Sequence, residues 1–482
     1  MLLKCNSEQL AHPTSDLRNF AGWLSFVCSG VLVTSASACA PESTDLLLGR
    51  AEQPLLAQVG PLDGQPAGGG FPSWFRDTNG IRLGLCVDAG DPLCIAAPVP
   101  NPRAPIAFPG NFPDEAFWWS ADALLTTANG GDAQLVLALE AAFVNEVPAA
   151  GDQIAFGRIR LRIDNLPVGS YVITHPFGVD EFEVTAATAN IRRSINETQD
   201  IGNLLGGSFE PVLGGRIGPF LVWDDASELP SGYLGDPRVA HTVVGSPFGT
   251  NFFQIEGPSG AFTGSPDLCV DPAGAVRNDC IRGASFFVQA KLAPNAGLEI
   301  VQALYTDNPR GQFVDVFARS EASQELVLSS LSIGDTPFEE DGGGDYFARM
   351  TYQGIRPADL EVINFSDTPP TRRRVELLVD EVHVSSASYD TATRRLVVAA
   401  LSADANATLR LDRLTPTVVA GNAGAPFTFT VENVRVPPRV VSVSSSAGGS
   451  SSATVILKPG LFNSAAAAGT QGPELAPIAV IR

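Results

Sequence analysis

The chain has 482 residues, 44% of them hydrophobic, and carries a formal net charge of −21. This excess of carboxylates excludes a general nucleic-acid binder, because phosphate backbones are held by basic surfaces. The length is enough for several hydrophobic cores, so we expect roughly two to four domains. An acidic protein of this kind is expected to meet cations, sugars or other proteins.

An apolar segment near the N-terminus predicts export. Residues 20–39 read FAGWLSFVCSGVLVTSASAC and end in small residues. The apolar part is shorter than the roughly 20 residues that a membrane-spanning helix needs, and the small residues at its end favour cleavage after Ala38. We therefore interpret residues 1–38 as a signal peptide, which places the mature protein in the cell envelope or outside the cell.

Cleavage after Ala38 leaves Cys39 at the mature N-terminus, where it resembles the lipidated cysteine of bacterial lipoproteins. Ala36 stands where that family has Leu or Val, so a lipid-anchored and a freely secreted protein are both consistent with the sequence. Contact with a membrane is expected only through such an N-terminal anchor. Residues 39–70 are rich in Pro, Gly and Ala without a periodic pattern, which predicts a flexible tether.

Four further cysteines fall in two similar loops that both contain the motif Leu-Cys-Val-Asp and close with Cys-Ile. An oxidising compartment favours disulfides, and the shared motif predicts that Cys86 pairs with Cys94 and Cys269 with Cys280. A zinc site is the alternative interpretation. The lack of His in both loop sequences argues against it.

Gly and Pro are spread along the chain and separate short runs of alternating apolar residues, which is typical of β-strands. The period-two run QIAFGRIRLRI at residues 153–163 predicts one of them. Residues 134–145, QLVLALEAAFVN, depart from this pattern, because Leu135, Leu139 and Ala142 form one helical stripe. The predicted fold class is mainly β, a multidomain chain of antiparallel β-sandwiches with one short helix.

Two segments in the C-terminal third align as tandem repeats of about 80 residues. The first begins EIVQALYTD at Glu299 and the second VHVSSASYD at Val382. Short strands and turns at this interval resemble the immunoglobulin-like β-sandwich modules of bacterial secreted and surface proteins. The resemblance implies one sandwich at residues 297–370 and another at 371–455, but no particular binding residues.

The rest of the chain is divided by composition. Residues 71–205 and 206–296 are expected to form two β-rich domains, each with one of the disulfide loops. Residues 456–482 are expected to form a tail, because they are rich in Ala and Gly and carry no recognisable sorting motif.

An acidic, Gly-rich loop with the sequence DTPFEEDGGGD is the candidate metal site. A hard cation such as Ca²⁺ takes roughly six to eight oxygen ligands, which carboxylates supply. The candidate ligands are Asp335, Glu339, Glu340, Asp341 and Asp345. Their spacing differs from that of an EF-hand loop, so a solvated hairpin is the alternative, and no cofactor other than Ca²⁺ is expected.

Trp118 and Trp119 are the candidate ligand-binding residues. Adjacent residues of an extended strand point to opposite faces, so one of the two is expected to be exposed. Exposed aromatic rings are used by sugar-binding surfaces, whereas packing under a loop is the alternative.

No catalytic residues are predicted, because neither His175 nor His241 is accompanied by a G-x-S-x-G motif. We interpret the chain as an exported bacterial surface or secreted protein that acts as a binding, adhesion or structural module. An extracellular polysaccharide or a surface protein is the expected partner. The alternative is an exported polysaccharide hydrolase with a pair of carboxylates within residues 71–296.

Overall fold

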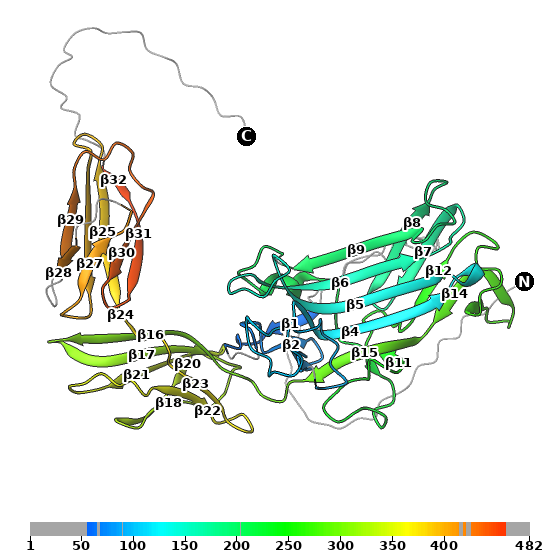
Figure 1. Ribbon diagram of the computed structural model, residues 1–482, viewed down its shortest axis with the longest axis horizontal. Helices are drawn as coiled ribbons and strands as arrows, with labels where there is room; N and C mark the ends of the chain where they lie inside the picture. The colour runs from blue at the N-terminus through cyan, green and yellow to red at the C-terminus, as the bar shows by residue number, and fades with distance from the viewer. Residues whose placement is uncertain are drawn as a thin grey trace, which may run out of the picture. The chain divides into compact units, whose positions relative to one another are not determined.

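The computed structural model describes residues 55–64, 68–88, 90–202, 204–413, 418–420 and 426–458. All of them belong to one compact unit, Leu47–Arg482. The predicted signal peptide and Cys39 lie outside the described residues. The described residues form several sheets with mostly antiparallel pairing, which confirms the mainly β fold class (Figure 1).

A ten-stranded sheet contains the longest strands, in the order β1-β2-β3-β15-β4-β5-β6-β9, with β11 joining β15 and β10 joining β11. Its strands are β1 (Leu56–Val59), β2 (Trp74–Asp77), β3 (Arg82–Gly84), β4 (Glu115–Thr126), β5 (Asp132–Phe143), β6 (Gln153–Ile163), β9 (Ile195–Gly202), β10 (Val222–Trp223), β11 (His241–Val244) and β15 (Ser285–Leu292). Figure 1 shows β4, β5, β6 and β9 side by side.

A five-stranded sheet packs against one face of the ten-stranded sheet. It contains β7 (Gly169–His175), β8 (Gly178–Val184), β12 (Phe253–Glu256), β13 (Leu268–Val270) and β14 (Val276–Gly283), and the short 3-10 helices η2 (Ala128–Gly130) and η3 (Glu210–Gly214) lie in connections. One buried cluster joins both sheets, with Leu137 and Val288 from the first and Tyr171 and Ile255 from the second. We call this two-sheet unit the first sandwich.

The domain boundary that we predicted between residues 205 and 206 falls inside the first sandwich. Strand β15 follows that position in sequence but pairs with β4, which precedes it. Strand β1 belongs to the same sheet, with Leu56 buried, although it lies in the segment predicted as a tether. Pairing between strands distant in sequence unites these regions around one core.

The predicted helix over residues 134–145 is wrong, because residues 132–143 form strand β5. Strand β5 pairs with β4 on one side and β6 on the other over almost its whole length. Leu135, Leu137 and Leu139 alternate into the core, while Ala138 and Glu140 are buried on the opposite face. A central strand with buried residues on both faces loses much of its period-two signal, and its pairing overrides helix propensity.

The chain from Leu298 to Asp380 forms a second sandwich, which we call the first repeat sandwich. One sheet has the order β20-β21-β17-β16-β24 and the other β19-β18-β22-β23. The strands are β16 (Glu299–Asn308), β17 (Gly311–Arg319), β18 (Leu326–Ser330), β19 (Gly334–Pro337), β20 (Glu339–Glu340), β21 (Asp345–Thr351), β22 (Glu361–Asn364), β23 (Thr371–Arg374) and β24 (Val379–Asp380). Val316 and Val362 meet in its core.

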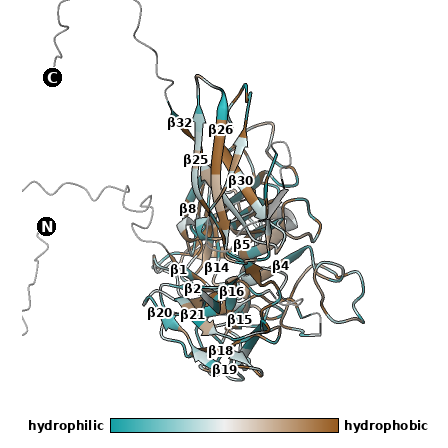
Figure 2. Cartoon of the chain, turned by 90° about the vertical axis from the view of Figure 1, so that its left-hand side faces the viewer, coloured by the Kyte–Doolittle hydropathy of each residue, from teal (hydrophilic) through white to brown (hydrophobic). Residues whose placement is uncertain are grey.

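The second repeat sandwich has sheets ordered β29-β26-β25-β32 and β28-β27-β30-β31. Its strands are β25 (Val382–Asp390), β26 (Arg395–Ser402), β27 (Thr408–Leu411), β28 (Val418–Ala420), β29 (Phe427–Val431), β30 (Val440–Ser445), β31 (Ser450–Thr454) and β32 (Ile456–Lys458). Strand β26 is largely hydrophobic, as its brown colour in Figure 2 shows, and Val398 lies in this core.

Apart from the additional edge strand β20 in the first, the two repeat sandwiches share their strand order and two local features. The first strand of each contains a bulge, between Ile300 and Gln302 in β16 and between Val384 and Ser386 in β25. The last strand of each, β24 or β32, pairs in parallel with that first strand. This agreement matches the tandem repeat in the sequence, and it places β32 within the segment predicted as a tail.

Candidate functional site

The structure contains both predicted disulfides, Cys86–Cys94 and Cys269–Cys280. The second joins the neighbouring strands β13 and β14. The first closes a loop whose end is held on the ten-stranded sheet, because the buried side chain of Gln289 bonds to both the backbone N–H and the C=O of Ile95 at 2.7 and 3.1 Å. Both bridges therefore fasten loops of the first sandwich.

Trp118 and Trp119 are both buried at 0% exposure, so the prediction of an exposed aromatic residue is wrong. A β-bulge between Phe117 and Trp119 places one extra residue in β4 and breaks the alternation, so that both rings enter the core. Their indole N–H groups donate to the C=O of Pro72 and of Leu221 at 3.1 and 3.2 Å. Neither ring is available to a sugar.

The acidic loop does not gather its five carboxylates around one point. Asp335 accepts a hydrogen bond from the Ser329 hydroxyl, and Glu339 lies opposite Phe347 in the sheet. Glu340 accepts a hydrogen bond from the Ser323 N–H, and Asp341 accepts hydrogen bonds from the N–H groups of Gly343 and Asp345. The carboxylate of Asp345 forms a salt bridge with Arg319. Among the described residues, no group of three His, Cys, Asp or Glu side chains is placed to hold a metal ion. The geometry thus gives no support to the calcium hypothesis, which stays a prediction.

His175 is buried and has no nitrogen available to act as a base. Its Nε2 lies 2.9 Å from Oδ2 of Asp180, and its Nδ1 accepts from the Phe177 N–H at 3.2 Å. Burial opposes ionisation of Asp180, but hydrogen bonds from His175 and Arg216 lower the pKa of this carboxyl to about 2. Burial lowers the pKa of His175, and this side chain forms a structural cluster with Asp180 and Arg216 at the β7–β8 hairpin.

A buried carboxyl group lies on the face of the ten-stranded sheet that points away from the core, which we call the outer face. The Glu140 side chain is 2% exposed, and its Oε2 lies 2.7 Å from Nη1 of Arg158. Burial raises the pKa of Glu140 to about 9, and the nearby Glu115 carboxyl also raises it. The positive charge of Arg158 lowers this pKa, but by less than burial raises it. Arg158 also forms a bidentate pair with Asp200 at 2.7 and 2.8 Å.

The carboxyl groups of Glu115 and Glu140 form a pair within residues 71–296, where the hydrolase alternative requires one. The Glu115 carboxyl contributes to the raised pKa of Glu140. Retaining glycosidases separate their two carboxyl groups by roughly 5–5.5 Å and inverting enzymes by more, which leaves room for the sugar or for water. Here both carboxyl groups contact Nη1 of Arg158, Oε1 of Glu115 at 3.6 Å and Oε2 of Glu140 at 2.7 Å, so the guanidinium group lies beside both of them.

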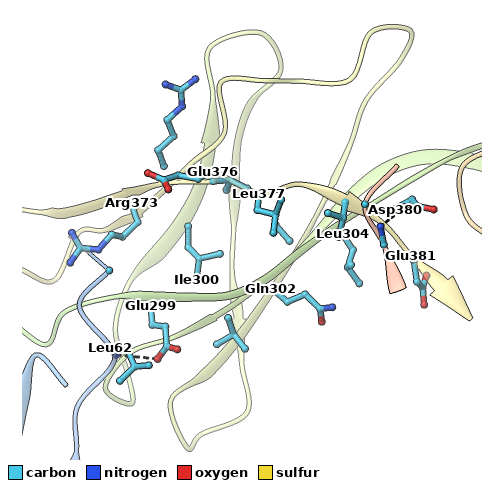
Figure 3. A pocket seen from close by; sticks show the side chains of 18 of the residues that line it. Leu62, Glu299, Ile300, Gln302, Leu304, Arg373, Glu376, Leu377, Asp380 and Glu381 are labelled. Atoms are coloured by element: carbon cyan, nitrogen blue, oxygen red, sulfur yellow. Dashed lines mark hydrogen bonds between the residues drawn. The ribbon is translucent and has the colours of Figure 1, made fainter. Parts of the chain in front are cut away.

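A groove of about 850 Å³ lies beside β16 of the first repeat sandwich (Figure 3). Its long sides are the first half of β16 and the segment from Arg373 to Val382, with Leu62 near one end and Gly449 among the remaining lining residues. The groove exists because the chain changes sheets after β23. Strand β23 pairs with β22 in one sheet, whereas β24 pairs with β16 in the other.

The first half of β16 keeps an open edge in this groove. Strand β24 pairs only with Leu304 and Tyr305, and the Glu381 N–H donates to the C=O of Tyr305 at 3.4 Å. Tyr305 directs its C=O toward this side, and alternate residues of a strand direct their backbone groups to the same side. Ala303, two residues before Tyr305, therefore directs its N–H and C=O into the groove. Within the described residues, no strand pairs with β16 on that side before Leu304.

Apolar side chains lie next to the open edge. Val301 is 50% and Leu377 74% exposed. Figure 3 shows Ile300 and Leu377 between the β16 ribbon and the segment that leads to β24. A partly open edge with adjacent apolar side chains is suited to binding an extended chain.

Charged side chains surround the groove, and some of them already have partners. Arg373 pairs with Asp63 at 2.7 Å, and Glu299 accepts from the Leu62 N–H at 3.1 Å. Within the described part of the chain, Glu376 and Glu381 form no salt bridge and are exposed. The sequence carries no local signal for this site, because it depends on where the chain crosses between two sheets.

No helix in the described part of the chain is long and apolar enough to cross a membrane. No family model and no curated protein matches the chain. Among solved structures, one similar chain is described as "Biofilm associated protein - BSP domain", with 11% sequence identity and a TM-score of 0.17. The match covers 64% of each chain, so this protein spans less than two thirds of that structure's length. A TM-score of this size carries no inference about fold or function.

Proposed function

We propose that the protein is an exported surface or secreted binding protein that captures an extended polypeptide segment of a surface partner in the groove beside β16. The observation that carries this proposal is the open edge of β16 next to the exposed side chains of Val301 and Leu377. Two disulfides in the described chain support export, since such bonds persist in oxidising compartments. The two repeat sandwiches are proposed to be immunoglobulin-like modules.

The groove offers two kinds of contact to such a segment. The backbone groups of Ala303 supply main-chain hydrogen bonds, which give affinity in strand addition, and the neighbouring apolar side chains supply sequence preference. The exposed carboxylates of Glu376 and Glu381 favour a segment with Lys or Arg beside its apolar residues.

The test uses a random-peptide library displayed on phage and panned on the purified protein. Enriched peptides are then synthesised, and their affinities are measured by fluorescence anisotropy. The double variant Val301→Glu, Leu377→Glu places charge at the apolar positions of the groove, and we expect it to bind these peptides at least roughly tenfold more weakly. The matched control is Leu331→Glu, Ile355→Glu, which changes two side chains that are 98% and 94% exposed outside the groove.

Strand addition makes a further demand on the peptide backbone. N-methylation of alternate peptide positions removes the N–H groups that face β16, so one set of methylated peptides should lose binding while the other set keeps it. Equal binding by the groove variant and the wild-type protein would remove the groove from the proposal, and so would a failure of the library to enrich any peptide.

A further inference from the structure

Three arginines line up on the outer face of the ten-stranded sheet. Arg158, Arg160 and Arg162 occupy alternate positions of β6, while Ile159 and Leu161 between them are buried in the core. The first sandwich therefore presents a row of positive charge, although the chain has 52 acidic and only 31 basic residues.

Only the first arginine of the row is neutralised. Arg158 is held by Asp200 and Glu140, whereas Arg160 donates from Nε to the hydroxyl of Thr198 at 3.2 Å. The Nε of Arg162 is buried and has no hydrogen-bond partner. Among the described residues, neither Arg160 nor Arg162 forms a salt bridge.

Two more arginines approach from the turn before β9. Burial lowers the pKa of Arg162, and the charges of the neighbouring Arg160, Arg193, Arg158 and Arg192 lower it further. Arg192 is exposed, and no carboxylate of the described chain forms a salt bridge with Arg192 or Arg193. We call Arg160, Arg162, Arg192 and Arg193 the arginine cluster.

The acidic groups near the arginine cluster do not cancel its charge. Burial raises the pKa of Asp122 to about 6 against the charge of Arg160, and among the described residues these two side chains form no salt bridge. Asp164 accepts from the backbone N–H of Arg193 at 2.7 Å and so is used to hold the turn. The cluster thus carries positive charge that the described chain leaves available for an anion.

Neutral polar side chains flank the cluster on the same face. Gln134 of β5 and Asn196 of β9 lie directly opposite Arg162, and Thr198 lies opposite Arg160. Asn196 and Thr198 are exposed. Amides and hydroxyls donate and accept hydrogen bonds, which suits sugar hydroxyl groups, while guanidinium groups match carboxylates and sulfates in bidentate geometry.

We propose that the arginine cluster is a binding site for an anionic polysaccharide, with Arg160 and Arg162 holding its carboxylate or sulfate groups. The neighbouring Gln134, Asn196 and Thr198 bind its hydroxyl groups. Strands β5, β6 and β9 are neighbours in the sheet, so these side chains lie side by side on the outer face, where an extended polymer would cross them. This site lies on the first sandwich, and it is independent of the groove beside β16.

The experiment measures binding of the whole purified protein to immobilised polygalacturonate, dextran sulfate, uncharged dextran and duplex DNA by biolayer interferometry. The variant is Arg160→Gln, Arg162→Gln, and the control is Arg435→Gln, Arg439→Gln, which removes the same charge from exposed positions of the second repeat sandwich. We expect the variant to bind the anionic polymers at least roughly tenfold more weakly than the control, because charge-assisted hydrogen bonds are lost.

The arms of the experiment separate the alternatives. Binding to polygalacturonate with none to dextran sulfate identifies carboxylates as the recognised group, and the reverse identifies sulfates. Equal binding by the variant and the control overturns the proposal, as does the absence of binding to either anionic polymer. Tighter binding to duplex DNA than to both polymers also overturns it, since the site would then bind phosphate backbones.

Discussion

The buried carboxyl of Glu140 gives the stability of the first sandwich a specific pH dependence. Burial raises its pKa from the ordinary 4.5 to about 9, so the folded protein holds a proton that the unfolded chain releases above about pH 4.5. A raised carboxyl pKa makes the free energy of unfolding fall as pH rises between these two values. One proton corresponds to a slope of at most about 1.4 kcal/mol per pH unit.

The variant Glu140→Gln keeps the shape of the side chain and removes this titration. We expect the stability difference, wild type minus variant, to fall by up to about 2.7 kcal/mol between about pH 6.5 and 8.5. This window lies above the pKa of Asp122, which burial raises to about 6, so that group contributes little to the difference.

Tryptophan fluorescence during urea unfolding is the appropriate assay. In the described chain, the tryptophans Trp74, Trp118, Trp119 and Trp223 all belong to the first sandwich, so the signal reports its unfolding without the repeat sandwiches. Glu146→Gln, an exposed position in the turn after β5, is the matched control. Parallel pH profiles for the wild type and Glu140→Gln would refute the reasoning, because Glu140 would then ionise alike in the folded and unfolded states.

Two further predictions concern the same sandwich. Replacing Cys269 and Cys280 by Ser should lower the free energy of unfolding by about 3 kcal/mol, measured by urea titration, since the bridge closes a loop with a sequence separation of 11. An unchanged urea midpoint would contradict this stabilisation. Asp180→Asn should destabilise the protein at neutral pH. Because the pKa of Asp180 is lowered to about 2, the difference in free energy of unfolding between wild type and variant should shrink as pH falls from about 4 toward 2. A difference that does not depend on pH would contradict this prediction.

Features encoded by local patterns were predictable from the sequence. The alternation of apolar residues and the spread of Gly and Pro indicated a mainly β chain, and the shared Cys-Val-Asp motif indicated both disulfide pairs. The alternating arginines of β6 are also visible in RIRLRI, although nothing local says that Arg158 is neutralised while Arg160 and Arg162 are not. That distinction depends on Asp200, which the neighbouring strand β9 places opposite Arg158.

Other features were decided only by the tertiary structure, because they arise from pairing between distant segments. A bulge turned Trp118 and Trp119 into the same core, and pairing on both sides made a strand of the segment around Leu137. The groove beside β16 exists because the chain leaves one sheet after β23 and reaches the other only at Val379. The sequence by itself determined the strand-forming pattern and the cysteine pairs, since both follow from residue type and spacing. Only the fold decided which faces are covered, because burial depends on what packs against each strand.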